Sequence, residues 1–261
     1  MFRYYFLASL LPSILTLDTL PEVAFWEFNE LCRNNLNPQD LEKTKTIRRY
    51  IDIKNLRPFW QGKELDPHGN YTSKELDAHL LLEVGFPEYV FQFLRDHETV
   101  EERLDYFPKL LAQFYQEEIE NADHFLKNFL IFERDWRLVL VALRAKAYQK
   151  DLNWELQHED PFDDTIAYML KQNELKDFTP PDGYEDLKVI YEGSKNDPLK
   201  LHWETGVWRL KKIQSFVEGG SFSIDNILSY LAQLIIVENW MKLSQEDGMS
   251  IVRNIMKEPQ I

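Results

Sequence analysis

Hydrophobic side chains recur every three or four residues along most of the chain, which is the spacing of an amphipathic α-helix. The strongest run lies in roughly 119–149. Its apolar stripe consists of Phe125, Phe129, Phe132, Trp136, Val139, Leu143 and Ala147. A second long helix is predicted over about 224–243, where nearly every face is apolar and Glu238 is the exception. Such a helix is buried in a bundle or covered by a partner.

Polar residues mark where several helices begin. Asn37-Pro38-Gln39-Asp40 combines a capping Asn, a Pro at the first helical position and an acid in the first turn. It predicts a helix that runs toward Trp60. Thr72-Ser73-Lys74-Glu75 and Thr99-Val100-Glu101-Glu102 both fit the capping box, in which the Thr hydroxyl and the Glu carboxylate satisfy two backbone N–H groups. The sequence therefore predicts a mainly α-helical fold.

Breaks in this pattern divide the chain into four segments. Residues 1–98 are predicted to form an N-terminal helical unit, 99–150 a central long-helix unit and 201–261 a C-terminal helical unit. Residues 151–200 are predicted to be a looser connecting region because they hold several helix-breaking residues. These are Pro161, Pro180, Pro181, Gly183, Gly193 and Pro198. One continuous domain is the alternative.

Two short segments leave the type of element open. Val189-Ile190-Tyr191 fits a short helix or a short strand, and the same two interpretations apply to 4–11. We therefore expect at most a minor short strand element in a helical fold.

The chain is acidic, because 30 Lys and Arg oppose 44 Asp and Glu and leave a net charge of −14. Nucleic-acid binding needs a clustered basic face, and a polybasic membrane anchor needs a basic run. The sequence has neither, so we expect neither partner. Aromatic residues make up 14% of the chain, and aromatics fill helix seams or anchor a protein partner.

Several features bear on where the protein is found. The single cysteine, Cys32, allows no intramolecular disulfide and fits a reducing compartment. No apolar run reaches the length of a membrane span, about 18 residues. Pro12 interrupts the apolar N-terminal run, and no A-x-A-like cleavage site follows, which argues against a signal peptide. We expect a cytoplasmic protein.

Candidate chemistry is sparse in the sequence. No phosphate-binding glycine loop, dinucleotide fingerprint or nucleophile elbow is present. The densest cluster of possible metal ligands is His158, Glu159, Asp160, Asp163 and Asp164, for which a capped helix start is the favoured interpretation over a metal site. We therefore expect no cofactor and no catalytic site, and an enzyme that uses the His158 cluster is a minor alternative.

A short internal sequence similarity relates the long helices. Leu130-Ile131-Phe132-Glu133 matches Ile235-Ile236-Val237-Glu238, and in both places a Trp and then a basic residue with Leu follow. A fainter third copy joins 50–52 to 55–57. This similarity indicates either a repeated helical unit or a chance match between amphipathic helices.

Several stretches together resemble a known family. They are 4–12; Asp52-Ile53-Lys54-Asn55-Leu56-Arg57 with Trp60, Gly62 and Lys63; Asp66 with Gly69-Asn70 and Glu75-Leu76; 132–137 with 142–146; and 222–225 with 230–231 and 237–243. They resemble an uncharacterised bacterial family encoded within V-type ATPase gene clusters. More distantly they are similar to the C subunit of archaeal and bacterial V/A-type ATPases, which is the d subunit of the eukaryotic enzymes.

The specific part of this resemblance is the pattern Asp-x-x-Asn-Leu-[Arg/Lys], which the C subunit repeats in three helical units. It is intact at 52–57, while the second copy offers Asp135-Trp136-Arg137 and the third Glu238-Asn239-Trp240. The resemblance implies a multi-helix bundle of repeated units without catalytic activity. It further implies a component that couples the central rotor stalk of a V-type ATPase or ATP synthase to the membrane rotor ring, for proton or sodium ion transport. The partners would be the stalk subunits and that ring, on the cytoplasmic face of the membrane. An unrelated all-helical protein interaction scaffold is the alternative.

The polar members of the repeated pattern are the candidate functional residues. They either lock helices together or bind a partner, and locking is the favoured interpretation. It predicts that replacing Asn55 by Leu alters stability more than association. The candidates are Asp52, Asn55, Arg57, Arg137, Glu238, Asn239 and Trp240.

Overall fold

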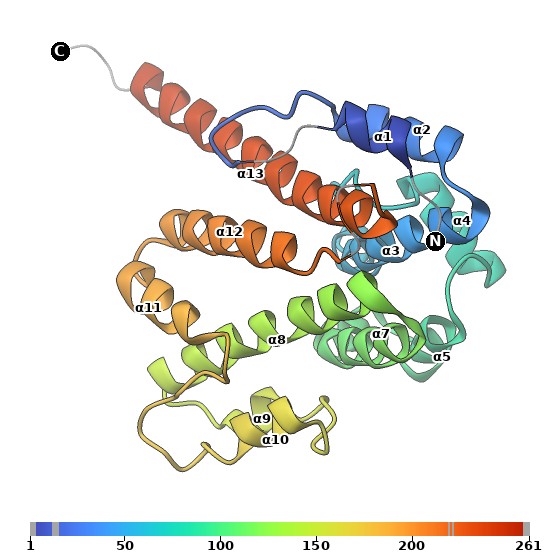
Figure 1. Cartoon of the computed structure of the whole chain (residues 1–261). Coiled ribbons are helices and arrows are strands. Elements are labelled where there is room, and N and C mark those ends of the chain that lie inside the picture. The colour runs from blue at the N-terminus through green and yellow to red at the C-terminus, as the bar shows by residue number, and fades with distance from the viewer. Residues whose placement is uncertain (1–3, 12–15, 219, 221, 258–261) are drawn as a thin grey trace. The chain divides into compact units, whose positions relative to one another are not determined.

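The computed structural model describes residues 4–11, 16–218, 220 and 222–257, with side chains up to Leu243. These residues form thirteen α-helices and no strand (Figure 1), which confirms the mainly helical prediction. The helices are α1 (Tyr5–Leu10), α2 (Phe25–Asn35), α3 (Pro38–Trp60), α4 (Ser73–Leu82), α5 (Glu88–Asp96), α6 (Val100–Asp105), α7 (Phe107–Asn121), α8 (His124–Ala147), α9 (Leu152–Glu155), α10 (Asp164–Leu170), α11 (Glu185–Ser194), α12 (Pro198–Ser215) and α13 (Ile224–Lys257). In these ranges no helix has the length and apolar composition that crossing a membrane requires.

The strand interpretations of the two ambiguous segments are wrong. Residues 189–191 lie inside α11, and α1 covers 5–10. In α11, Leu187 and Tyr191 are buried while Val189 is exposed. Since residues four apart share one face of a helix, the buried pair fits the helical period.

Contacts group the chain into two compact units. The terminal unit consists of the described residues of 1–41 and 196–261, and the middle unit consists of 42–195. One boundary therefore falls inside helix α3, and the other follows the end of α11. The division into four segments made from the sequence stays a prediction.

The terminal unit is built on α13. Helices α12 and α2 pack against α13, and α1 packs against α2. Every residue from Leu231 to Val237 is buried, as expected for a helix that is apolar on nearly every face. Gly206 of α12 passes so close to Leu17 that a Cβ atom would lie 2.9 Å from a Leu17 methyl group. A larger residue at 206 would therefore force Leu17 to move.

The middle unit is built on α7 and α8. Helices α5 and α6 pack against α7, while α9 and α11 pack against α8. Of the predicted stripe of α8, Phe125, Phe129, Phe132, Val139 and Leu143 are buried, Trp136 is half-buried and Ala147 is exposed. The core also takes in Phe93, Phe114 and Tyr115.

The predicted helix starts are confirmed. Asn37 Oδ1 accepts a hydrogen bond from the backbone N–H of Asp40 at 2.9 Å, at the start of α3. Thr72 with Glu75 and Thr99 with Glu102 form complete capping boxes at α4 and α6. Each box satisfies two backbone groups that a helix start leaves open.

The region 151–200 is tied to α8 by a lysine. Lys146 Nζ donates to the backbone carbonyls of Gln172 and Asn173 at 2.7 Å and of Leu175 at 2.8 Å. A charged donor shared by three carbonyls fixes the turn that follows α10.

Candidate functional site

The intact motif copy on α3 holds the loop at 66–71. Asn55 Nδ2 donates to the carbonyl of Asp66, and the N–H of Asp66 donates back to Asn55 Oδ1, both at 2.9 Å. Asp52 Oδ1 accepts from the N–H of Asn70 at 2.7 Å and of Tyr71 at 3.2 Å. The two motif side chains thus bond backbone N–H and C=O groups of this loop.

The loop also packs closely against Asp52, and burial changes the pKa of that carboxyl group. A Cβ atom on Gly69 would lie 2.4 Å from Asp52 Oδ1, so only glycine fits there without a shift. Burial raises the pKa of Asp52 to about 6, although the hydrogen bonds from Asn70 and Tyr71 and the charge of Arg48 oppose that rise. Arg48 Nε donates to the carbonyl of His68 at 3.2 Å.

The second motif copy lies on α8 and binds two acidic residues from the following region. Arg134 donates to Asp135 at 2.8 Å and forms an ion pair with Asp163 at 2.9 Å. Arg137 forms an ion pair with Glu159 at 2.9 Å. Burial raises the pKa of Asp135, and the neighbouring Arg134 limits that rise.

The third copy lies on α13 in the terminal unit. Glu238 Oε1 accepts from the backbone N–H of Phe25 at 2.7 Å, at the first turn of α2. A carboxylate there satisfies an open N–H group and complements the helix dipole. Asn239 and Trp240 are half-buried, and the Trp240 ring stacks on His202 at 5.8 Å between centroids.

The structure brings the candidates together only in part. Asp52 and Asn55 act on one loop, whereas Arg137 contacts a different segment of the middle unit, and Glu238 belongs to the terminal unit. Arg57 is exposed, and its guanidinium carbon lies 5.9 Å from the centre of the Phe107 ring. Whether any of these residues also binds a partner stays a prediction.

The His158 cluster is dispersed. Asp163 caps α10 by accepting from the N–H groups of Thr165 and Ile166, and Glu159 pairs with Arg137. In the part of the chain that the structure describes, no three His, Cys, Asp or Glu side chains are arranged to hold a metal ion.

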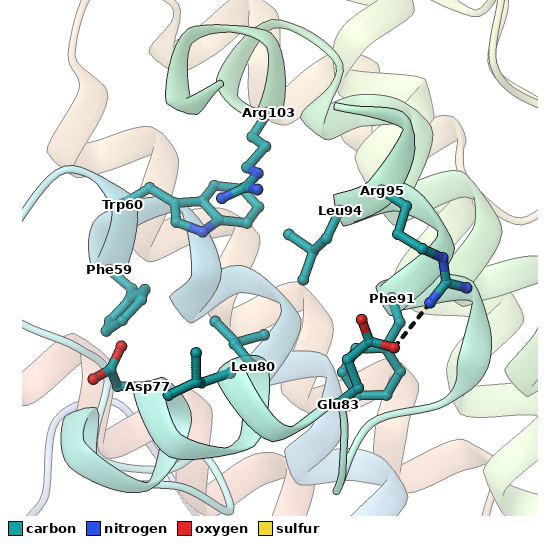
Figure 2. Close-up of a pocket in the computed structure, with 10 residues that line it drawn as sticks. Phe59, Trp60, Asp77, Leu80, Glu83, Phe91, Leu94, Arg95 and Arg103 are labelled. Atoms are coloured by element: carbon teal, nitrogen blue, oxygen red, sulfur yellow. Dashed lines mark hydrogen bonds and ion pairs between the residues drawn. The ribbon is translucent and has the colours of Figure 1, made fainter. Parts of the chain in front are cut away.

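A groove that the motifs did not indicate opens in the middle unit, where the last turn of α3 meets α4, α5 and α6 (Figure 2). Its volume is about 380 Å³. The lining side chains are Phe59, Trp60, Asp77, Leu80, Leu81, Glu83, Phe91, Leu94, Arg95 and Arg103. The sequence signal for it is Leu80-Leu81-Leu82, a run of leucines too long for one buried face of a short helix.

Aromatic packing holds Trp60, one of the residues that line this groove. The Trp60 ring stacks on Phe93 and meets Phe107 edge-on, both at 6.3 Å between centroids. Arg103 lies 5.9 Å from the centre of the Trp60 ring, and its Nε donates to the carbonyl of His97 at 2.8 Å. Trp60 is therefore held in place by contacts on several sides.

The groove is rimmed by charge. Asp77 and the Glu83–Arg95 ion pair, 3.0 Å long, lie toward opposite ends of its α4 side (Figure 2). Arg95 also pairs with Glu88. Residues 73–105, which span α4 to α6, contain nine Asp and Glu against three Lys and Arg, a net charge of −6.

Comparison with known proteins identifies relatives and a family for this chain. The chain is 26% identical to uncharacterized proteins of Chlamydia muridarum and Chlamydia pneumoniae, and each alignment covers 98% of both chains. A third such relative, from Chlamydia trachomatis, is also 26% identical over 97% of both chains. No solved structure gives a significant match. Residues 1–259 match the family described as "Protein of unknown function (DUF2764)", and the chain therefore belongs to that family.

Proposed function

We propose that this protein is a non-catalytic component of a V-type ATPase or ATP synthase, of the same kind as the C subunit. In this role it couples the central rotor stalk to the membrane rotor ring during proton or sodium ion transport. It is held on the cytoplasmic face of the membrane through its partner subunits. Its task is to transmit torque through a rigid helical body.

The observation that best supports the proposal is a shared role of the three motif copies. On α3, Asp52 and Asn55 hold the loop 66–71. On α8, Arg137 holds Glu159, and on α13 Glu238 holds the start of α2. In each case a polar group on a long helix fastens a segment distant in sequence, as expected of repeated units that share one design.

The mechanism requires stiffness rather than chemistry. A body that passes torque must not open its loops under load, and local opening is least where buried polar groups are fully paired. Asp52 and Asn55 are buried and are bonded in this way. Half-buried Lys146 adds three carbonyl bonds that hold the turn after α10.

Co-purification from native membranes tests the proposal. A tagged chain is expressed at its native level, membranes are solubilised in mild detergent, and the recovered proteins are identified by mass spectrometry. We expect stalk subunits and the rotor ring in stoichiometric amounts, and none with a tagged unrelated cytoplasmic protein. Recovery of neither would overturn the proposal, and a different stoichiometric partner would favour the interaction scaffold.

A further inference from the structure

We infer that the groove between α3, α4, α5 and α6 binds a basic amphipathic helix of a partner protein. This names a surface and a partner chemistry that the proposed function does not specify. It stands on the apolar lining of the groove and on the charge around it.

The apolar lining has the form of a helix-binding groove. Leu81 is 83% exposed, and Leu80 and Leu94 beside it are half-buried. Phe59 and Trp60 continue this surface from α3. An amphipathic helix that presents anchors at positions i, i+3 or i+4 and i+7 would cover such a row of side chains. Covering a leucine as exposed as Leu81 changes affinity roughly tenfold.

The charge around the groove selects a cationic partner. The lining holds two acids and two arginines. Arg95 pairs with Glu83 of the lining and with Glu88, and Arg103 bonds the His97 carbonyl, so Asp77 is the acid of the lining that neither arginine takes up. Asp77 is exposed on α4, one turn before Leu81. The segment 73–105 carries a net charge of −6, which is a large share of the −14 of the whole chain. The excess of acidic side chains in this segment attracts a lysine- or arginine-bearing helix and repels polyphosphates and anionic lipid.

Two synthetic peptides provide the probes. Both are helical, about five turns long, and share the same leucine face. One carries lysines on its polar face and the other glutamates. Each carries a fluorophore, and its anisotropy is followed as the full-length chain is added at fixed ionic strength. We expect the lysine peptide to bind at least about tenfold more tightly than the glutamate peptide.

Variants separate binding in the groove from general attraction to an acidic protein. Leu81→Glu blocks the apolar surface but adds a negative charge, so bulk attraction would strengthen lysine-peptide binding whereas the groove predicts a loss of about tenfold or more. Leu20→Glu adds the same charge at a residue that is 73% exposed in the terminal unit, and no loss is expected. Asp77→Lys should weaken the lysine peptide a few-fold.

Either of two results would overturn the inference. The first is equal binding of the lysine peptide to the wild type and to Leu81→Glu. The second is equal binding of the lysine and glutamate peptides to the wild type. Circular dichroism of each variant shows whether it is folded, which is expected because all three substituted side chains are exposed. If the peptide results hold while co-purification recovers no rotary ATPase subunit, the groove stands and the proposed function fails. The reverse pair of results would reject the groove alone.

Discussion

Replacing Asn55 by Leu removes the two hydrogen bonds that join α3 to Asp66 and keeps a side chain of similar size. Asn55 is 2% exposed, and its amide both donates to and accepts from the Asp66 backbone at 2.9 Å. A buried group left without its partner costs about 1–3 kcal/mol. Two part-buried backbone groups lose theirs here, so we expect the free energy of unfolding to fall by roughly 2–4 kcal/mol.

The assay is urea unfolding followed by circular dichroism, together with amide hydrogen exchange at Asp66. For a protein of this size, 1 kcal/mol corresponds to about 2–4 °C in melting temperature. The matched control is Arg57→Leu on the same helix, where the side chain is exposed and loses only its contact with the Phe107 ring, so a change below about 1 kcal/mol is expected. A loss below about 0.5 kcal/mol for Asn55→Leu, with unchanged exchange at Asp66, would refute the reasoning. A variant of normal stability that no longer associates with its partner would show that Asn55 serves binding instead.

Three further predictions concern hydrogen bonds and packing that hold loops to the long helices. Gly69→Ala should lower the melting temperature, because the added Cβ would lie 2.4 Å from Asp52 Oδ1 and overpacking costs about 1–3 kcal/mol. In an Asp52→Ala background the same substitution should cost less, and an equal loss in both backgrounds would contradict the clash. Lys146→Met should lower the free energy of unfolding by about 1.5–3 kcal/mol because three carbonyls lose a charged donor, whereas exposed Lys150→Met should change little in the same urea titration. The raised pKa of Asp52, about 6 in the folded chain against 3.8 for an unperturbed aspartate, means that the folded state holds this proton more tightly. Its contribution to stability is therefore present below about pH 4 and is lost as the pH rises through 6, a change of up to roughly 3 kcal/mol. Asp52→Asn should lack this pH-dependent contribution. If the urea midpoints of the wild type and of Asp52→Asn change in parallel between pH 4 and 7, the raised pKa of Asp52 is contradicted.

The sequence predicts what is local in this fold. Helix starts such as Asn37 and the capping box at Thr72 depend on residues a few positions apart, and both are confirmed. The apolar period of α8 also identified its buried face. These signals suffice because helix geometry ties each residue to its near neighbours.

Pairings between distant residues could not be predicted in the same way. Nothing in the local pattern joins Asp52 to Asn70, 18 residues later, or Arg137 to Glu159. For that reason the His158 cluster suggested a possible ligand set, while two of its acids, Glu159 and Asp163, pair with arginines of α8. The groove escaped prediction because it depends on which leucines of α4 remain uncovered, and only the packing of α3, α5 and α6 decides that.

The terminal unit combines the two ends of the chain, so it can complete its core only late in synthesis. Helices α1 and α2 leave the ribosome early, but the helices they need for a core, α12 and α13, emerge only after the whole middle unit. The bond between Phe25 and Glu238 spans 213 residues. Since domains generally fold as units during translation, the middle unit can complete its own core first. Until α13 is synthesised, the apolar face of α2 has no helix to cover it. We therefore expect the nascent chain to be most prone to aggregation during that interval.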